Sequence, residues 1–160
     1  MQAKFLAPIV VALTLAPAGA SLAADQAAPA AAPAPAAAAA PAPEETGTKL
    51  SATLNGASEV GGGDTDGTGS FSATIAKDKL CYTLTAGNID EATMAHIHKG
   101  AAGANGPVFI GLPDLDPGEH CEDIGADRLD QLKSKPGDYY VNVHNGDFPG
   151  GAVRGQLAKN

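Results

Sequence analysis

Short segments in which apolar and polar residues alternate follow one another from about residue 48 to the end of the chain. In the first of them, Leu50, Ala52 and Leu54 alternate with Ser51 and Thr53. Successive residues of a β-strand point to opposite faces, so this pattern predicts a half-buried strand. Residues 71–75 and 80–84 show the same alternation. Four further short segments between turns rich in Gly, Asp, Asn and Pro are also predicted as strands: residues 94–98, 108–112, 139–144 and 152–157.

The turns between these segments predict antiparallel pairing. Lys77 and Asp78 separate the second strand from the third, which gives an antiparallel meander, and residues 145–151 (NGDFPGG) connect the last two strands as a hairpin. One short helix is predicted over residues 127–133, ending before Pro136. About seven antiparallel strands with one short helix predict an all-β fold, either a β-sandwich or a flattened barrel.

The first 46 residues lack this alternation. Lys4 precedes an apolar run over residues 5–15, and small residues follow it, which predicts a secretory signal peptide over residues 1–23. Residues 24–46 consist almost entirely of Ala and Pro, so we expect a disordered linker there and one folded domain over residues 47–160. No stretch reaches the ~20 apolar residues that a membrane-spanning helix needs. We therefore expect a periplasmic or secreted protein without membrane insertion.

The charge of the chain narrows the choice of partners. The sequence has 18 acidic and 10 basic residues, a formal net charge of −8, and loss of Lys4 with the leader would make it more negative. An acidic protein of this kind is repelled by nucleic acid and by anionic membranes. The expected partner is therefore a protein or another extracellular ligand, which the sequence does not identify.

Two cysteines remain in a chain that is expected to be exported. Cys81 and Cys121 are an even number of cysteines in an oxidising compartment, which favours a disulfide. The alternatives are two free thiols or two thiolate metal ligands. A disulfide would connect the strand at residues 80–84 to residues 114–123 (DLDPGEHCED), the segment before the helix, which we expect to be an acidic surface loop.

Three histidines are candidate metal ligands. His96 and His98 lie two apart in one predicted strand, so they share a face, and His144 ends another strand on the face opposite Val141 and Val143. If the three converge, ring nitrogens from different strands should lie roughly 3–4 Å apart, as ligation of one ion requires.

Copper or zinc is the expected metal of such a site, with Cu(II) favoured by intrinsic affinity. His120 is a possible fourth ligand. The alternative interpretation is that these are polar surface histidines that stabilise loops.

Catalytic motifs are absent from the sequence. It has neither a G-x-S-x-G elbow nor a G-x-x-x-x-G-K phosphate loop. The H-x-H strand resembles that of copper–zinc superoxide dismutase, but the chain has four histidines, too few for the dinuclear site of that enzyme. Arg154 is expected to form a structural ion pair.

Two motifs resemble the chordin-type (CHRD) domain. They are the run from His96 to Val108 (HIHKGAAGANGPV) and the segment YVNVH followed by RGQ, residues 140–144 and 154–156. The resemblance covers roughly residues 48–157 and implies an all-β extracellular domain. It implies an exported, non-enzymatic module with a binding or structural role. The alternative function is a mononuclear copper- or zinc-binding protein that uses the three histidines, with at most weak superoxide-dismutase-like activity.

Overall fold

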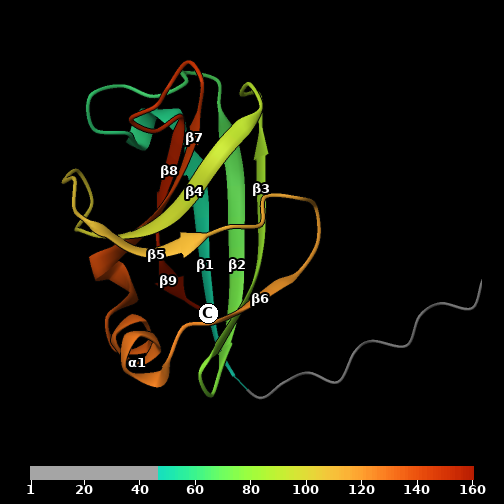
Figure 1. The fold of residues 1–160 in the computed structure, drawn as a ribbon. Coiled ribbons are helices and arrows are strands. Elements are labelled where there is room, and N and C mark those ends of the chain that lie inside the picture. The colour runs from blue at the N-terminus through green and yellow to red at the C-terminus, as the bar shows by residue number, and fades with distance from the viewer. Residues whose placement is uncertain (1–46) are drawn as a thin grey trace, which may run out of the picture. The chain divides into compact units, whose positions relative to one another are not determined.

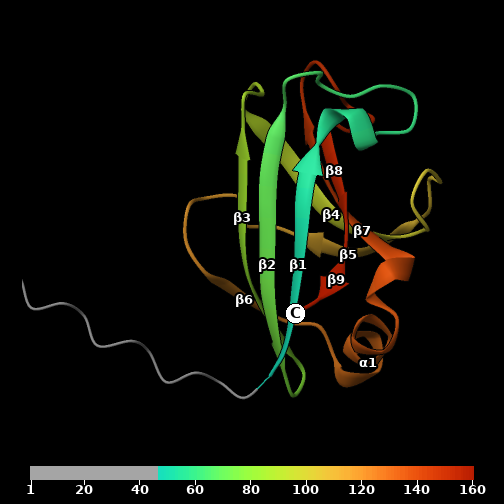
Figure 2. The same ribbon diagram turned by 180° about the vertical axis from the view of Figure 1, so that it is seen from behind.

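The computed structural model describes residues 47–160, shown in Figures 1 and 2. The signal peptide expected over residues 1–23 and the linker expected over residues 24–46 lie outside the described residues. Every strand segment expected from the alternation is present, and the helix extends one residue further at each end than expected. The elements are β1 (Thr48–Asn55), η1 (Gly56–Ser58), β2 (Thr68–Ala76), β3 (Lys79–Gly87), β4 (Ala92–Lys99), β5 (Val108–Leu112), β6 (His120–Asp123), α1 (Ala126–Ser134), η2 (Pro136–Asp138), β7 (Tyr139–Asn145), β8 (Val153–Gln156) and β9 (Ala158–Lys159).

The first three strands form the expected antiparallel meander. Ala73 of β2 pairs with Leu50 of β1 on one side and with Tyr82 of β3 on the other. Because side chains alternate across a strand, the apolar residues of all three strands lie on one face of the meander. Lys77 adopts a positive φ of 55° in the turn between β2 and β3.

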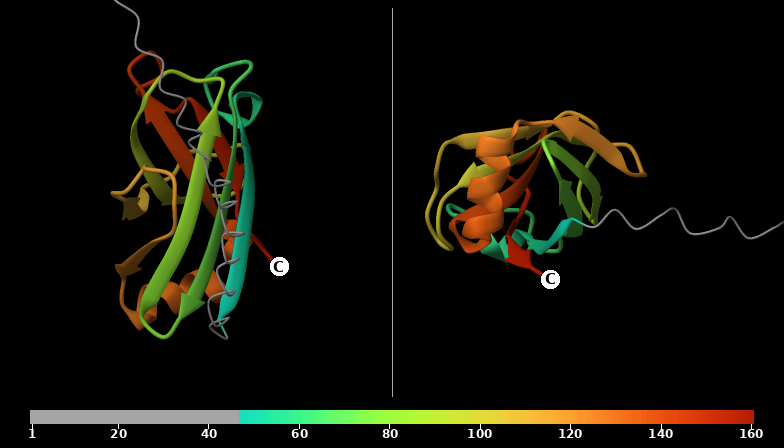
Figure 3. Two further views of the ribbon diagram at one scale, coloured as in Figure 1. Left: turned by 90° about the vertical axis from the view of Figure 1, so that its right-hand side faces the viewer. Right: turned by 90° about the horizontal axis from the view of Figure 1, so that it is seen from below.

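All of the described strands belong to one curled sheet. Its order is β5-β4-β7-β8-β1-β2-β3-β6, with β9 beside β1. β8 meets β1 through a single residue pair, Asn55 with Arg154, and the sheet turns there, as the views in Figure 3 show. Gly155 allows this close crossing, because a Cβ at that position would collide with the backbone of Thr53.

The curl brings the apolar faces of the two halves of the sheet together. Leu54 and Phe71 from the meander belong to the same buried cluster as Ile97 of β4 and Val141 of β7. The expected all-β fold is thus confirmed, as a sandwich made from one curled antiparallel sheet.

The helix α1 lies at the lower end of the molecule in Figure 1. Its two leucines, Leu129 and Leu132, are fully buried in the core. Asp127 in its first turn and Lys133 in its last turn suit the helix dipole. Within residues 47–160 no helix has the length and apolar character needed to cross a membrane.

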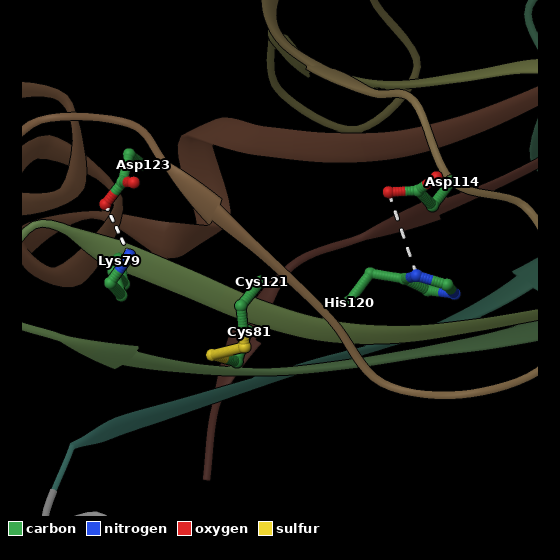
Figure 4. The surroundings of a disulfide bond; sticks show 6 residues. All are labelled: Lys79, Cys81, Asp114, His120, Cys121 and Asp123. Atoms are coloured by element: carbon green, nitrogen blue, oxygen red, sulfur yellow. Dashed lines mark hydrogen bonds and ion pairs between the residues drawn. A yellow bond between two sulfur atoms is a disulfide. The ribbon is translucent and has the colours of Figure 1, made fainter.

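The acidic segment before the helix differs from the expectation of a loop. Its last four residues form β6, which pairs with β3 so that Cys81 and Cys121 lie directly opposite each other. The two cysteines form a disulfide, as expected, and no free cysteine remains in the described part of the chain. Figure 4 shows the disulfide between two polar contacts, Lys79 with Asp123 and His120 with Asp114. The short strand was not evident in the sequence, because its alternation is polar on both faces.

Candidate metal centre

Three histidines converge on the outer face of β4 and β7. His96 and His98 alternate with the buried residues Ala95 and Ile97, so their rings point away from the core. Across the strand pair, Nδ1 of His96 lies 3.2 Å from Nε2 of His144. One ring nitrogen of each histidine lies within 4.8 Å of the other two. The convergence that the sequence left open is present, whereas metal binding by these residues stays a prediction.

Backbone carbonyls fix the orientation of two of the three rings. Nδ1 of His98 lies 2.9 Å from the carbonyl oxygen of Gly106, and Nδ1 of His144 lies 3.0 Å from that of Pro149. A carbonyl oxygen only accepts hydrogen bonds, so both Nδ1 atoms must carry the proton. In the neutral rings, Nε2 of each histidine is therefore an unprotonated acceptor that can bind a cation. Metal-bound histidines commonly have this arrangement, with the second ring nitrogen donating to a carbonyl.

The buried Nε2 of His98 has no hydrogen-bond partner among residues 47–160. A buried acceptor without a partner costs about 1–3 kcal/mol. If the Nδ1 proton of His96 goes to Nε2 of His144, the lone pair on His98 stays unsatisfied. A single cation bound by all three rings would satisfy every free lone pair of the cluster.

Arg154 supports the loop that orients His98. Its side chain is 2% exposed and donates hydrogen bonds to the carbonyl oxygens of Ala101 (3.2 Å) and Ala104 (2.7 Å) and to Oδ1 of Asn105 (3.1 Å). Gly106 belongs to the same loop, residues 100–107 between β4 and β5. The expectation that Arg154 forms an ion pair is wrong. Its guanidinium donates to neutral oxygens, and it forms no ion pair within residues 47–160.

Tyr140 links this arginine to the histidines. The Arg154 guanidinium lies 3.4 Å from the centre of the Tyr140 ring, a cation–π contact. The same ring stacks on His98 with its centre 4.9 Å away, and Tyr140 Oη accepts a hydrogen bond from the amide of Gly106. The contacts of Tyr140 and Arg154 therefore fix both the His98 ring and the carbonyl that binds it.

Electrostatics favour the neutral form of the histidines that a metal requires. Burial lowers the pKa of His96 below its usual value, and the neighbouring His144 and His98 lower it further. Burial also lowers the pKa of His144, outweighing its hydrogen bond to Pro149. Nearby Glu59 accepts a hydrogen bond from Asn142, and burial raises the pKa of its carboxyl.

His120 does not belong to this cluster. It lies on β6, which pairs with β3 rather than with β4 or β7. Its Nε2 donates to the carbonyl of Asp116 at 2.9 Å, and its Nδ1 lies 3.7 Å from a carboxylate oxygen of Asp114 (Figure 4). The structure thus does not place His120 as the fourth ligand that the sequence suggested.

Three residues that position His98 were not predicted from the sequence: Tyr140, Arg154 and Gly106. Met94, two residues before His96, was also overlooked, although the strand alternation places it on the same face. The alternation could have indicated Met94, whereas the contacts of Arg154 depend on a loop whose path no periodicity predicts.

Acidification should destabilise the metal-free protein. His96 and His144 bind protons less readily in the folded state than in the unfolded chain, where the pKa is near the ordinary value of 6.5. The unfolded state therefore gains protons first, and stability is lost as the pH falls below about 6.5. We expect a lower unfolding midpoint at pH 5 than at pH 7 in chelator-treated protein, measured by circular dichroism.

The control for this prediction removes the two histidines whose pKa values are lowered, His96 and His144. Glu59, whose pKa is raised, acts in the opposite sense and remains in every variant. The double variant His96→Gln/His144→Gln should lose much of the decrease between pH 7 and pH 5, whereas His120→Gln should keep it. Equal decreases in all three proteins would show that other groups cause the pH dependence.

Taken together, the fold and the cluster define a β-sandwich module with three convergent histidines on one outer face. Residues 50–157 match the family model of the CHRD domain, and the chain belongs to this family. Among curated proteins and solved structures, none matches the chain. The family and the disulfide both fit an exported protein.

Proposed function

We propose that this CHRD-domain protein is an exported module that binds one copper or zinc ion. Nδ1 of His96, Nε2 of His98 and Nε2 of His144 would hold the ion. The observation that carries the proposal is that one ring nitrogen of each histidine lies within 4.8 Å of the other two, with His98 and His144 oriented through their Nδ1–H groups. Nε2 of His98 is buried and has no hydrogen-bond partner among residues 47–160. This favours a cluster that binds a cation over a cluster of histidines held together by hydrogen bonds alone.

The donor atoms of the site are those that copper and zinc prefer. Imidazole nitrogen suits copper and zinc, and three such ligands leave a further position open. A bound ion would supply Lewis acidity, and copper would add one-electron redox chemistry. The net charge of −8 opposes the electrostatic attraction of anions such as superoxide. We therefore assign the module a metal-binding role rather than an enzymatic one.

Metal titration of protein purified without an affinity tag tests this function. Calorimetry at neutral pH should give about one equivalent of copper per chain. The affinity should fall only at pH values well below ~6.5, because the pKa values of His96 and His144 are lowered in the folded protein and protonated imidazole does not coordinate. His144→Ala should remove most of the affinity without loss of the fold, since its ring lies outside the apolar core.

His120→Ala is the matched control, because it removes a histidine that makes comparable contacts away from the cluster. It should bind copper as the unaltered protein does. Absence of both copper and zinc binding at neutral pH would contradict the proposal. The protein would then be a binding or structural module of another kind.

A further inference from the structure

Met94 lies beside the histidine cluster on the same face of the sheet. It precedes His96 by two residues in β4, and across the strand pair it lies directly opposite His144. Side chains of directly opposed residues have Cβ atoms about 4.5–5.5 Å apart. Met94 is therefore a strand neighbour of two of the three candidate ligands.

The position of Met94 is unusual for an apolar residue. Its side chain is 51% exposed, one of three large hydrophobic residues with such exposure in the described part of the chain. Met94 and His96 together line a cavity of about 410 Å³. The methionine is thus exposed beside His96, at a cavity that both residues line, and its three rotatable side-chain bonds allow the sulfur to reach different positions.

We propose that the Met94 thioether is a fourth ligand and that it makes the site selective for copper, including Cu(I). This inference rests on the proposed metal-binding function and specifies its metal. Three histidines alone suit zinc and Cu(II), whereas a soft thioether favours Cu(I). A methionine ligand beside His96 and His144 would therefore favour copper over zinc.

The composition of the chain makes this proposal easy to test. The sequence has two methionines, Met1 and Met94, and two cysteines, both in the disulfide. Met1 falls within the segment expected to be removed as a signal peptide. A sulfur bound to copper in the mature protein would therefore come from Met94.

The experiment compares the mature chain with its Met94→Leu variant, which keeps the size and apolar character of the side chain. Cu(I) is supplied as a complex with a chromophoric chelator under anaerobic conditions, and Zn(II) is titrated separately. Met94→Leu should weaken Cu(I) binding by about 10- to 100-fold. Substitution of residues that support a metal site typically lowers the metal affinity by this factor. Zn(II) affinity should change by less than about twofold.

X-ray absorption at the copper edge gives an independent readout. Protein labelled with selenomethionine should give a copper–selenium signal that is absent from Met94→Leu. Glu122 lines the same cavity and is the competing fourth ligand. If Glu122→Gln weakens copper binding and Met94→Leu does not, or if no selenium signal is found, the proposal is overturned. If neither metal binds the unaltered protein, the proposed function itself has failed.

Discussion

Arg154→Met should lower the free energy of unfolding by about 3 kcal/mol. The arginine is buried, and its guanidinium donates to three oxygens in the loop between β4 and β5. Methionine can fill part of the volume but donates no hydrogen bond. Each buried acceptor that loses its partner costs about 1–3 kcal/mol, and exposed parts of the loop can recover some of this loss through water. Urea unfolding followed by circular dichroism measures the change.

Metal binding by this variant distinguishes a structural role from a role in the site. Because Arg154 holds the loop that contains Gly106, its loss should also free the His98 ring. Copper affinity should therefore fall under conditions where the variant is fully folded. Lys79→Met is the matched control: Lys79 forms an exposed ion pair with Asp123, and such pairs contribute little. Equal effects of the two variants would contradict the role assigned to Arg154.

Removal of the disulfide should have an effect of similar size. The bond between Cys81 and Cys121 joins residues 40 apart in the sequence. In the chain-entropy model, closing a loop of this length stabilises the folded state by about 4 kcal/mol, and measured losses are typically about 2–5 kcal/mol. The double variant Cys81→Ser/Cys121→Ser should show a loss in this range in urea unfolding. It avoids the free thiol that a single substitution would leave.

The thiol content of the protein and the copper affinity of the double variant give two further tests of the disulfide. Denatured but unreduced protein should contain essentially no thiol that reacts with a thiol reagent; two per chain would contradict the bond. The folded double variant should keep its copper affinity, because β3 and β6 contribute no residue to the histidine cluster. A loss of both stability and copper binding would mean that β6 positions the site after all.

Strand alternation explains why much of the fold and the three histidines could be predicted. His96 and His98 were placed on one face because they lie two apart, and His144 was placed opposite Val141 and Val143 for the same reason. Convergence followed because β4 and β7 are paired in the sheet, with His96 opposite Asn142. Pairing of distant strands was not predictable from periodicity alone. The sequence therefore indicated the candidate ligands, and the sheet order explains how they meet.

Other features depend on contacts that leave no periodic signal. The carbonyls of Gly106 and Pro149 reach the rings of His98 and His144 because two loops fold over the outer face of β7. β6 forms where Cys121 pairs with Cys81, in a segment whose acidic residues predicted a surface loop. Arg154 was expected to pair with a carboxylate, but its partners are loop oxygens and the face of Tyr140. Such contacts arise from the path of the loops and require the folded structure.

Anomalous scattering at the copper edge, from crystals of the copper-loaded protein, tests the central claim most directly. One peak per chain should lie about 2.0–2.1 Å from Nδ1 of His96, Nε2 of His98 and Nε2 of His144, the distance typical of metal–imidazole bonds. A peak at His120, or no peak between β4 and β7 in crystals grown at neutral pH with excess copper, would contradict the account.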